Sequence, residues 1–224
     1  MTAPPTRPAA VLFDLDGTLV DSAPDLAHAG NALRLRRQLH ALPVERFRPM
    51  TGSGARGMIG VALGIEAGDE RFEALKTEFL EAYAACLDER TRVFEDLWPV
   101  LGALESAQLP WGIVTNKAAR FTTPVVRAAG LAERSAVVVS GDTTPHAKPH
   151  PEPLLEAARR LGLAAADCVY VGDDLRDVQA GRAAGMRTVA VRWGYLGTGE
   201  AIERWGADHV IDQPHELLKL FGLA

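Results

Sequence analysis

Short, continuously apolar segments that each end at a polar residue recur along this sequence. The first runs from Ala9 to Phe13 and stops at Asp14, and similar segments cover residues 111–115, 136–140, 168–172 and 188–191. A strand that is apolar at every position is typical of a parallel sheet covered on both faces. Amphipathic helical patterns lie between the segments, at residues 100–107, 154–161 and 178–184. This alternation predicts an α/β fold, a doubly wound, Rossmann-like parallel sheet.

One region interrupts the alternation. Residues 22–92 contain no convincing strand, but they carry amphipathic helical patterns after Ser22, at residues 58–63 and at residues 72–87. We expect Ser22 to cap the first of these helices. A helical block inserted after the first strand should fold as a small lobe over that strand's end. The sequence thus predicts an α/β core domain, residues 1–21 and 93–224, and an all-helical cap domain, residues 22–92.

The segment DLDGTLVDS, residues 14–22, follows the first strand directly. Asp14 and Asp16 are two residues apart, and Gly17 permits a tight turn that brings both carboxylates toward one point. Two carboxylates held together do not ionise equally, so one of them can serve as an acid. The pair can also help to hold a hard cation such as Mg²⁺. In doubly wound sheets ligands bind at the carboxyl ends of strands, which is where these residues are expected.

A second acidic group, Asp173, Asp174 and Asp177, follows the segment 168–172. Asp173 and Asp177 are four residues apart, so we expect them on one face of the helix that starts there. Acidic residues also suit a helix N-terminus for electrostatic reasons alone. Three acids in five residues, in a chain that already has Asp14 and Asp16, are better explained by a metal site.

Two further strand ends carry weaker signals. Thr115 and Asn116 end the segment 111–115 and can offer a hydroxyl and backbone N–H groups to a phosphoryl oxygen, although a helix cap is an equally good interpretation. Lys148 precedes Pro149, and its ammonium is a point charge suited to phosphate. A lysine is more often a solvated surface group, so neither signal decides a function alone.

Composition narrows the class of protein. The formal net charge of −5 argues against nucleic acid as the main partner. No apolar segment is long enough to cross a bilayer, and the N-terminus has no apolar region typical of a secretory signal. The two cysteines, Cys86 and Cys168, form no disulfide framework or metal-binding pair. We therefore expect a cytoplasmic protein with no membrane or nucleic-acid partner.

Taken together, these motifs resemble the haloacid dehalogenase-like phosphohydrolases. DLDGTLVDS, the strand-end Thr115, Lys148-Pro149 and the GDD-x-x-D segment match the four motifs of that family in order, over essentially the whole chain. KPHPEPLLEAARRLG and VGDDLRDVQAGRAAG are similar to the phosphoglycolate phosphatase group. The segments GARGM and WGIVTNK fit the N-acetylmuramic acid 6-phosphate phosphatases about as well.

The resemblance implies a reaction mechanism. Asp14 would attack phosphorus and form an aspartyl-phosphate, and Asp16 would protonate the leaving alkoxide and later activate water. Thr115 and Lys148 would stabilise the equatorial oxygens of the transition state. Mg²⁺ would be the cofactor.

The implied metal ligands are Asp14, Asp173 and the backbone carbonyl of Asp16, with Asp177 supporting them. The helical lobe would close over the site and read the part of the substrate beyond the phosphate. Arg56 is the candidate for that contact, weighed evenly against a solvated side chain, and Asn116 is a candidate phosphate contact.

Other functions fit the motifs less well. A small-molecule phosphate ester is the expected partner, and 2-phosphoglycolate is the first choice of substrate. A sugar phosphomutase would keep Asp16, so that reaction stays open as a minor alternative. A phospho-receiver signalling module has similar strand-end residues but lacks a 70-residue helical insertion after its first strand. A non-catalytic binding protein would not need the complete acid set. The sequence does not distinguish a monomer from a homodimer.

Overall fold

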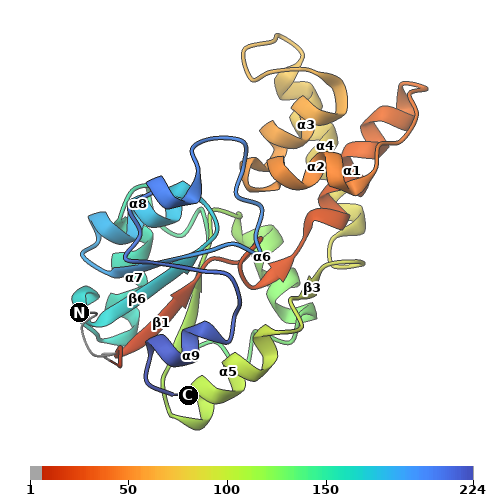
Figure 1. Ribbon diagram of the computed structural model, residues 1–224. Coiled ribbons are helices and arrows are strands. Elements are labelled where there is room, and N and C mark those ends of the chain that lie inside the picture. The colour runs from red at the N-terminus through yellow and green to blue at the C-terminus, as the bar shows by residue number, and fades with distance from the viewer. Residues whose placement is uncertain (1–6, 224) are drawn as a thin grey trace.

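A central sheet of six parallel strands organises the chain in a computed structural model that describes residues 7–223 (Figure 1). The strand order is β5-β4-β1-β6-β7-β8, and every neighbouring pair is parallel. The doubly wound α/β sheet predicted from the sequence is confirmed. The strands are β1 (Ala10–Phe13), β4 (Trp111–Val114), β5 (Val137–Val139), β6 (Cys168–Gly172), β7 (Arg187–Val191) and β8 (His209–Ile211).

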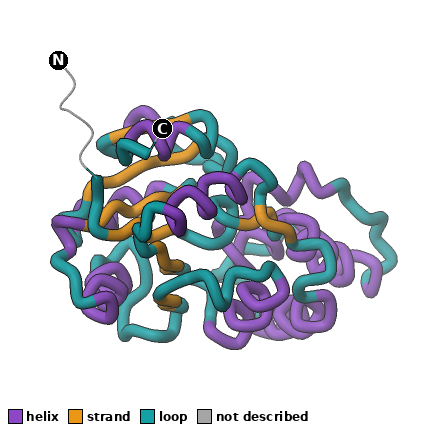
Figure 2. The backbone as a smooth tube through the Cα atoms, turned by 90° about the horizontal axis from the view of Figure 1, so that it is seen from below, coloured by secondary structure: helices purple, strands orange, loops and turns teal. Residues whose placement is uncertain are grey.

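Helices cover both faces of this sheet, as the view from below shows (Figure 2). Val11 and Phe13 of β1 pack into one apolar cluster with helices on one face, whereas Ala10 and Leu12 pack into a second cluster on the other face. This division explains why β1 is apolar at every position. The helices are α5 (Leu97–Ser106), α6 (Ala119–Ala128) and α9 (Glu216–Leu220) on the first face, and α7 (Glu152–Leu161) and α8 (Leu175–Ala183) on the second.

The interrupting region folds as a helical lobe beside the carboxyl ends of the strands (Figure 1). Its helices are α1 (Ala23–Arg36), α2 (Val44–Phe47), η1 (Arg48–Ser53), α3 (Gly54–Leu63) and α4 (Phe72–Cys86). They share an apolar cluster of their own, to which the core contributes Phe121 of α6. At the base of the lobe a two-stranded antiparallel ribbon pairs β2 (Val20–Asp21) with β3 (Arg92–Val93).

Two features bear on the remaining expectations. Within residues 7–223, no helix combines the length and the apolar character that a membrane span requires. Cys86 and Cys168 are both buried and free. The N-terminal stretch in which we expect no secretory signal lies partly outside the described residues.

Candidate active site

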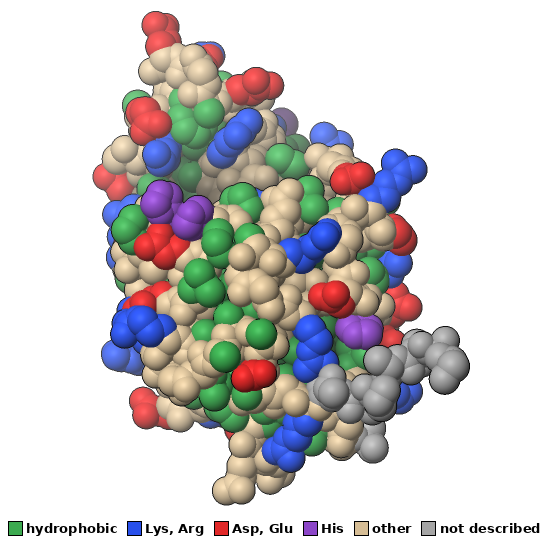
Figure 3. All heavy atoms as spheres, turned by 90° about the vertical axis from the view of Figure 1, so that its left-hand side faces the viewer, with side chains coloured by type: hydrophobic (Ala, Val, Ile, Leu, Met, Phe, Trp, Pro, Cys, Tyr) green, Lys and Arg blue, Asp and Glu red, His purple; other side chains and the backbone are tan. Residues whose placement is uncertain are grey.

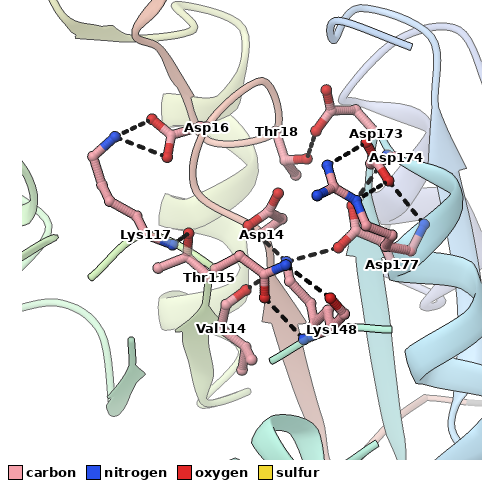
Figure 4. A network of polar contacts seen from close by, with 12 residues as sticks. Asp14, Asp16, Thr18, Val114, Thr115, Lys117, Lys148, Asp173, Asp174 and Asp177 are labelled. Carbon is pink, nitrogen blue, oxygen red and sulfur yellow. Dashed lines mark hydrogen bonds and ion pairs between the residues drawn. The ribbon is translucent and has the colours of Figure 1, made fainter. Parts of the chain in front are cut away.

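The carboxyl ends of three adjacent strands bring the sequence motifs together. Asp14 follows β1, Thr115 follows β4 and Asp173 follows β6, and these three strands are neighbours in the sheet. Lys148 reaches the same place from the loop before α7 (Figure 4). All four residues line a cavity of about 380 Å³ between the core and the helical lobe. The chain turns from one half of the sheet to the other beside β1, so this is the position where doubly wound folds bind ligands.

Lys148 is the central cation of the site. Its Nζ lies 2.8 Å from Asp14 Oδ1 and 2.7 Å from Asp177 Oδ1. It also donates to the Tyr170 hydroxyl at 2.8 Å and to the Val114 carbonyl at 3.1 Å. The residue is only 5% exposed, so Lys148 is not the solvated surface group that a lysine usually is. The charged form of a lysine buried to this extent is stabilised only because carboxylates and dipoles surround it.

Burial and crowding perturb the ionisation of this cluster. Burial raises the pKa of Asp14 to about 7, against the opposing effect of the Lys148 charge. The pKa of Asp173 is raised well above its usual value by burial and by the charges of Asp14 and Asp177. Burial lowers the pKa of Lys148, but the two carboxylates beside it outweigh that effect and raise it to about 12. The carboxylates of Asp14, Asp173 and Asp177 therefore repel one another when they are ionised. A further cation bound among them would stabilise their ionised form.

Asp173 is held rigidly beside Asp14. Its Oδ1 accepts a hydrogen bond from Thr18 Oγ1 at 2.8 Å, and its Oδ2 accepts one from the Tyr195 backbone N–H at 2.7 Å. The expectation that Asp173 and Asp177 share one helix face is wrong, because α8 begins only at Leu175. Asp174 is the N-cap of that helix, and Asp177 Oδ2 accepts from the Asp174 N–H at 3.0 Å in a capping box. The strand end and the first helical turn together bring the carboxylates near each other.

This acidic cluster fits a hard divalent cation. Carboxylate oxygens of Asp14, Asp173 and Asp177 lie within 4.8 Å of one another. The contact of Asp14 Oδ1 with Lys148 is an ion pair outside hydrogen-bonding geometry, so this buried oxygen accepts no hydrogen bond within the described residues. An all-oxygen donor set of this kind is suited to Mg²⁺. Both Asp177 oxygens already have partners, because Oδ1 contacts Lys148 and Oδ2 accepts the Asp174 N–H.

Asp16 points toward a different cation (Figure 4). Lys117 Nζ donates to its two oxygens at 2.8 and 3.0 Å, and Ser22 Oγ donates to Oδ1 at 2.5 Å. The expected capping role of Ser22 is therefore wrong: the residue occupies the N-cap position of α1, but its hydroxyl is engaged by Asp16. Burial lowers the pKa of Lys117, and the Asp16 charge outweighs this effect and raises it above its usual value. Asp14 and Asp16 thus occupy separate electrostatic environments.

Thr115 and Asn116 differ in which of their polar groups remain free to bind a ligand. The Thr115 hydroxyl accepts the Lys117 backbone N–H at 3.1 Å and lines the cavity, where it is free to donate to a ligand. The Asn116 side chain is already occupied: its Nδ2 donates to the Lys148 carbonyl and its Oδ1 accepts the Lys148 N–H, each at 2.9 Å. This amide pair holds the Lys148 loop against the end of β4. For a phosphate contact, Asn116 has its backbone N–H to offer.

The helical lobe supplies the far wall of the cavity, without Arg56. That residue lies in the first turn of α3, is exposed and is absent from the cavity lining. The lobe instead contributes the small residues of segment 51–55 and apolar side chains of α1 and α4. The core adds two arginines and a phenylalanine. Besides the strand-end residues and their neighbours, the lining includes Leu26, Thr51, Gly52, Ser53, Gly54, Ala55, Phe79, Leu80 and Tyr83 from the lobe, with Arg120, Phe121 and Arg176 from the core.

Three side chains that contact the site or join the lobe to the core were not singled out from the sequence. Lys117 binds Asp16, and Arg176 on α8 donates to the Gly52 carbonyl of the lobe at 2.5 Å. Tyr195, from the loop after β7, accepts the Ser22 and Ala23 N–H groups at 2.8 and 3.0 Å. Lys117 and Arg176 lie inside motifs that were recognised, WGIVTNK and GDDLRD. Their side chains meet partners about a hundred residues away, which spacing along one segment does not reveal.

The chain is similar to known proteins over nearly its full length. A family model described as haloacid dehalogenase-like hydrolase matches residues 11–191. An N-acetylmuramic acid 6-phosphate phosphatase of Pseudomonas putida is 43% identical over 97% of this chain and 98% of that protein. A phosphoglycolate phosphatase of Xanthomonas campestris pv. campestris is 46% identical over 94% of this chain and 95% of its own. The crystal structure of a predicted phosphoglycolate phosphatase from Haemophilus somnus superimposes with a TM-score of 0.83 at 27% identity, covering 96% of this chain and 98% of that one.

Proposed function

The chain belongs to the haloacid dehalogenase-like hydrolases as a phosphoric monoester hydrolase, and we propose that it cleaves a small-molecule phosphomonoester through an aspartyl-phosphate. One observation carries this proposal: Asp14 lies at the cavity with Lys148 Nζ 2.8 Å from its Oδ1 and two further carboxylates beside it. This arrangement places an anionic nucleophile where cations can offset the charge of a phosphate.

The side chains divide the work by their positions. Asp14 attacks phosphorus in line, and the bond from phosphorus to the substrate oxygen breaks. Asp16 donates a proton to that oxygen and, as the carboxylate, takes a proton from the water that hydrolyses the aspartyl-phosphate. The Thr115 hydroxyl donates a hydrogen bond to a phosphoryl oxygen. The Lys148 ammonium, whose three N–H groups are directed at Asp177, Tyr170 and Val114, offsets the phosphoryl charge electrostatically. Lys117, in contact with both Asp16 oxygens, orients Asp16 toward the substrate side of the cavity.

Mg²⁺ is the proposed cofactor, held by Asp14, Asp173 and the Asp16 carbonyl, with Asp177 supporting the site. When bound, it supplies positive charge that allows a carboxylate to approach a phosphate dianion. The three carboxylates that converge within 4.8 Å support this assignment.

We propose residues 22–92 as the cap domain that covers the substrate, and 2-phosphoglycolate as the principal substrate. The phosphoglycolate phosphatases among the relatives support this choice. N-acetylmuramic acid 6-phosphate is the second candidate, because the relative from Pseudomonas putida is so named and because the cavity of about 380 Å³ is large for a two-carbon acid. The apolar wall formed by Phe79, Leu80 and Phe121 suits a substrate with a substantial body beyond its phosphate.

The proposal extends to the setting of the enzyme. We propose a cytoplasmic monomer or homodimer that has no nucleic-acid or membrane partner. Two buried, free cysteines and a formal net charge of −5 support this setting.

The test is phosphate release from 2-phosphoglycolate, N-acetylmuramic acid 6-phosphate, hexose phosphates and nucleoside monophosphates. We expect many turnovers with Mg²⁺, none after chelation and recovery when Mg²⁺ is restored. The Asp173→Asn variant should need more Mg²⁺ than the parent as well as turn over more slowly. Full activity in excess chelator would contradict the metal assignment, and a single stoichiometric phosphorylation would indicate a signalling module instead.

A further inference from the structure

A second group of metal-ligating side chains lies outside the cavity, on the outer side of the loop that carries Lys148. His146 and His150 flank Lys148 at two residues on either side, and Glu152 is the first residue of α7. Figure 3 shows a pair of neighbouring histidines on the surface with acidic side chains beside them. Ligand atoms of these three residues lie within 4.8 Å of one another.

The three side chains are already arranged around a common point. His146 Nδ1 lies 2.7 Å from Glu152 Oε2, and His150 Nδ1 lies 3.9 Å from the same oxygen. Ligand atoms of a tetrahedral Zn²⁺ site, each about 2.0–2.2 Å from the ion, stand roughly 3.4 Å apart. The two observed separations lie on either side of that value, and all three ligand atoms lie within 4.8 Å of one another, so forming the site requires the rings and the carboxylate to reorient without moving the backbone apart.

Local contacts limit how far these ligands can move. The two imidazole rings stack with their centroids 4.4 Å apart, and the Glu152 backbone N–H donates to His150 Nδ1 at 3.2 Å. Metal binding through this nitrogen therefore replaces that hydrogen bond. Lys148 stands between the two histidines in the sequence, and the Asn116 amide pair holds its backbone against β4. Ligands fixed on a helix start and a braced loop lose less conformational entropy on binding than ligands on a free loop.

The donor set selects the kind of ion. Two imidazoles and one carboxylate suit Zn²⁺ and related transition metals, whereas Mg²⁺ prefers an all-oxygen site. The side chains of His146 and His150 are 62% and 48% exposed, so an ion and its water ligands can reach them. We propose that His146, His150 and Glu152 form a second divalent-metal site, specific for a transition-metal ion such as Zn²⁺, on the loop that carries Lys148.

Zinc titration of the full chain in saturating Mg²⁺ tests this proposal. We expect the parent protein to bind one equivalent of Zn²⁺, and the His146→Ala and His150→Ala variants to bind it at least tenfold more weakly. His28→Ala, which removes an exposed histidine from α1, is the matched control and should bind as the parent does. Zn²⁺ should also raise the melting temperature of the parent and of His28→Ala, but not that of His146→Ala.

Zinc bound instead at the acidic cluster would be revealed by a second pair of variants. Asp173→Asn and Asp14→Asn each remove a carboxylate from that cluster, and either variant that folds should retain the zinc equivalent. The proposal is overturned if the two histidine variants titrate like the parent, or if the equivalent disappears with the aspartate variants. The measurement is binding alone, so its outcome does not depend on the proposed phosphatase reaction.

Discussion

Asp14 and Asp16 are two residues apart in sequence, yet they contact different lysines. Lys148 lies beside Asp14 and Lys117 lies beside Asp16. A purely metal-binding pair of carboxylates would lose function in the same way when either was changed. The separate environments instead predict that the two residues fail differently.

We expect Asp14→Asn to abolish turnover and the phosphoenzyme, because an amide is a poor nucleophile toward phosphorus. Asp16→Asn should keep the nucleophile and lose the proton donor, so alkyl phosphates should slow by about 10²–10⁴-fold. An aryl ester such as p-nitrophenyl phosphate should slow less, since its phenolate leaves without a proton. The single-turnover phosphorylation rate separates this step from hydrolysis of the intermediate. Equal slowing of both esters would exclude Asp16 as the general acid.

The ionisation of Asp14 predicts a pH dependence of the metal-free protein. Its pKa is raised from 3.8 to about 7 in the folded chain, so the folded state binds this proton more tightly than the unfolded state. The resulting stabilisation is complete below 3.8 and is lost as the pH rises to about 7. We expect the unfolding free energy to fall across this interval by an amount on the order of a few kcal/mol.

Denaturant unfolding with and without Mg²⁺ measures this effect. Mg²⁺ should stabilise the protein more at about pH 7.5 than at about pH 5, where the carboxyl is protonated. Asp14→Asn removes the titrating group, so its metal-free stability should depend less on pH than that of the parent. An identical pH slope in both proteins would show that Asp14 does not carry the shift.

At the scale of elements, a residue of the loop after β7 caps the N-terminus of α1, a helix of the lobe. The Tyr195 hydroxyl accepts the N–H groups of Ser22 and Ala23 at the start of α1 and donates to Asp21 Oδ1 at 3.0 Å. It does the work that a capping side chain normally does, because the Ser22 hydroxyl is engaged by Asp16. The core and the lobe are therefore joined at this helix start.

We expect Tyr195→Phe to lower the unfolding free energy by about 1–3 kcal/mol, since the buried Ser22 N–H loses its acceptor and the Ala23 N–H keeps only its longer contact with Asp21. The ring and the backbone N–H to Asp173 stay in place, so the change isolates the hydroxyl. The urea midpoint should fall with an unchanged slope. An unaltered midpoint would mean that water or another group replaces the hydroxyl without penalty.

The elements that were predictable from the sequence are those whose pattern reflects burial on both sides. The five apolar segments correspond to β1, β4, β5, β6 and β7 within one or two residues. Strand β8 was missed because His209 is exposed and Val210 only partly buried, so the segment has no continuous apolar run. Helix α6 was missed because Thr122, Thr123 and Pro124 obscure the helical pattern, although Val125 and Val126 pack into the core.

In the site, the residues at strand ends were predictable from the sequence, and the side chains that depend on contacts between distant segments were not. Asp14, Thr115 and Asp173 meet because parallel strands end at one edge, which is a property of the fold class. Lys148 joins them from the loop before α7, which the Asn116 amide holds in place. The assignment of Arg56 rested on its position between helices, and the structure leaves that side chain in solvent. Which side chain of an irregular loop faces a cavity depends on contacts between distant segments, as Lys117 and Arg176 show.

For the whole molecule, Arg176 is a direct link between the two lobes. It forms an ion pair with Asp174 on the core at 2.7 Å and donates to the Gly52 carbonyl of the lobe. Both the core and the helical lobe line the cavity in this arrangement, and Arg176 itself lies in that lining. Loss of the link should reduce the population of this arrangement and hence the apparent affinity.

We expect Arg176→Ala to raise KM roughly tenfold or more, since a hydrogen bond from a charged donor contributes about 1.5–3 kcal/mol. Steady-state kinetics with the best substrate of the screen measure it. Arg159→Ala is the control, because Arg159 forms an ion pair of the same length, 2.7 Å, on the exposed face of α7. A KM that is equal in both variants would contradict a bridging role for Arg176.

The pairing of Asp21 with Arg92 places the two ends of the helical insertion side by side. The polypeptide leaves the core and returns to it at adjacent points of one short ribbon. The central sheet therefore does not fix the length or the shape of the helical segment between Asp21 and Arg92. A helical segment from a relative that acts on another ester could be grafted between these two residues, with Asp14, Thr115, Lys148 and Asp173 left untouched. Under the proposed roles of the two parts, such a graft should change the substrate range and leave the phosphate chemistry with the core, provided that the grafted segment keeps the Ser22 contact with Asp16.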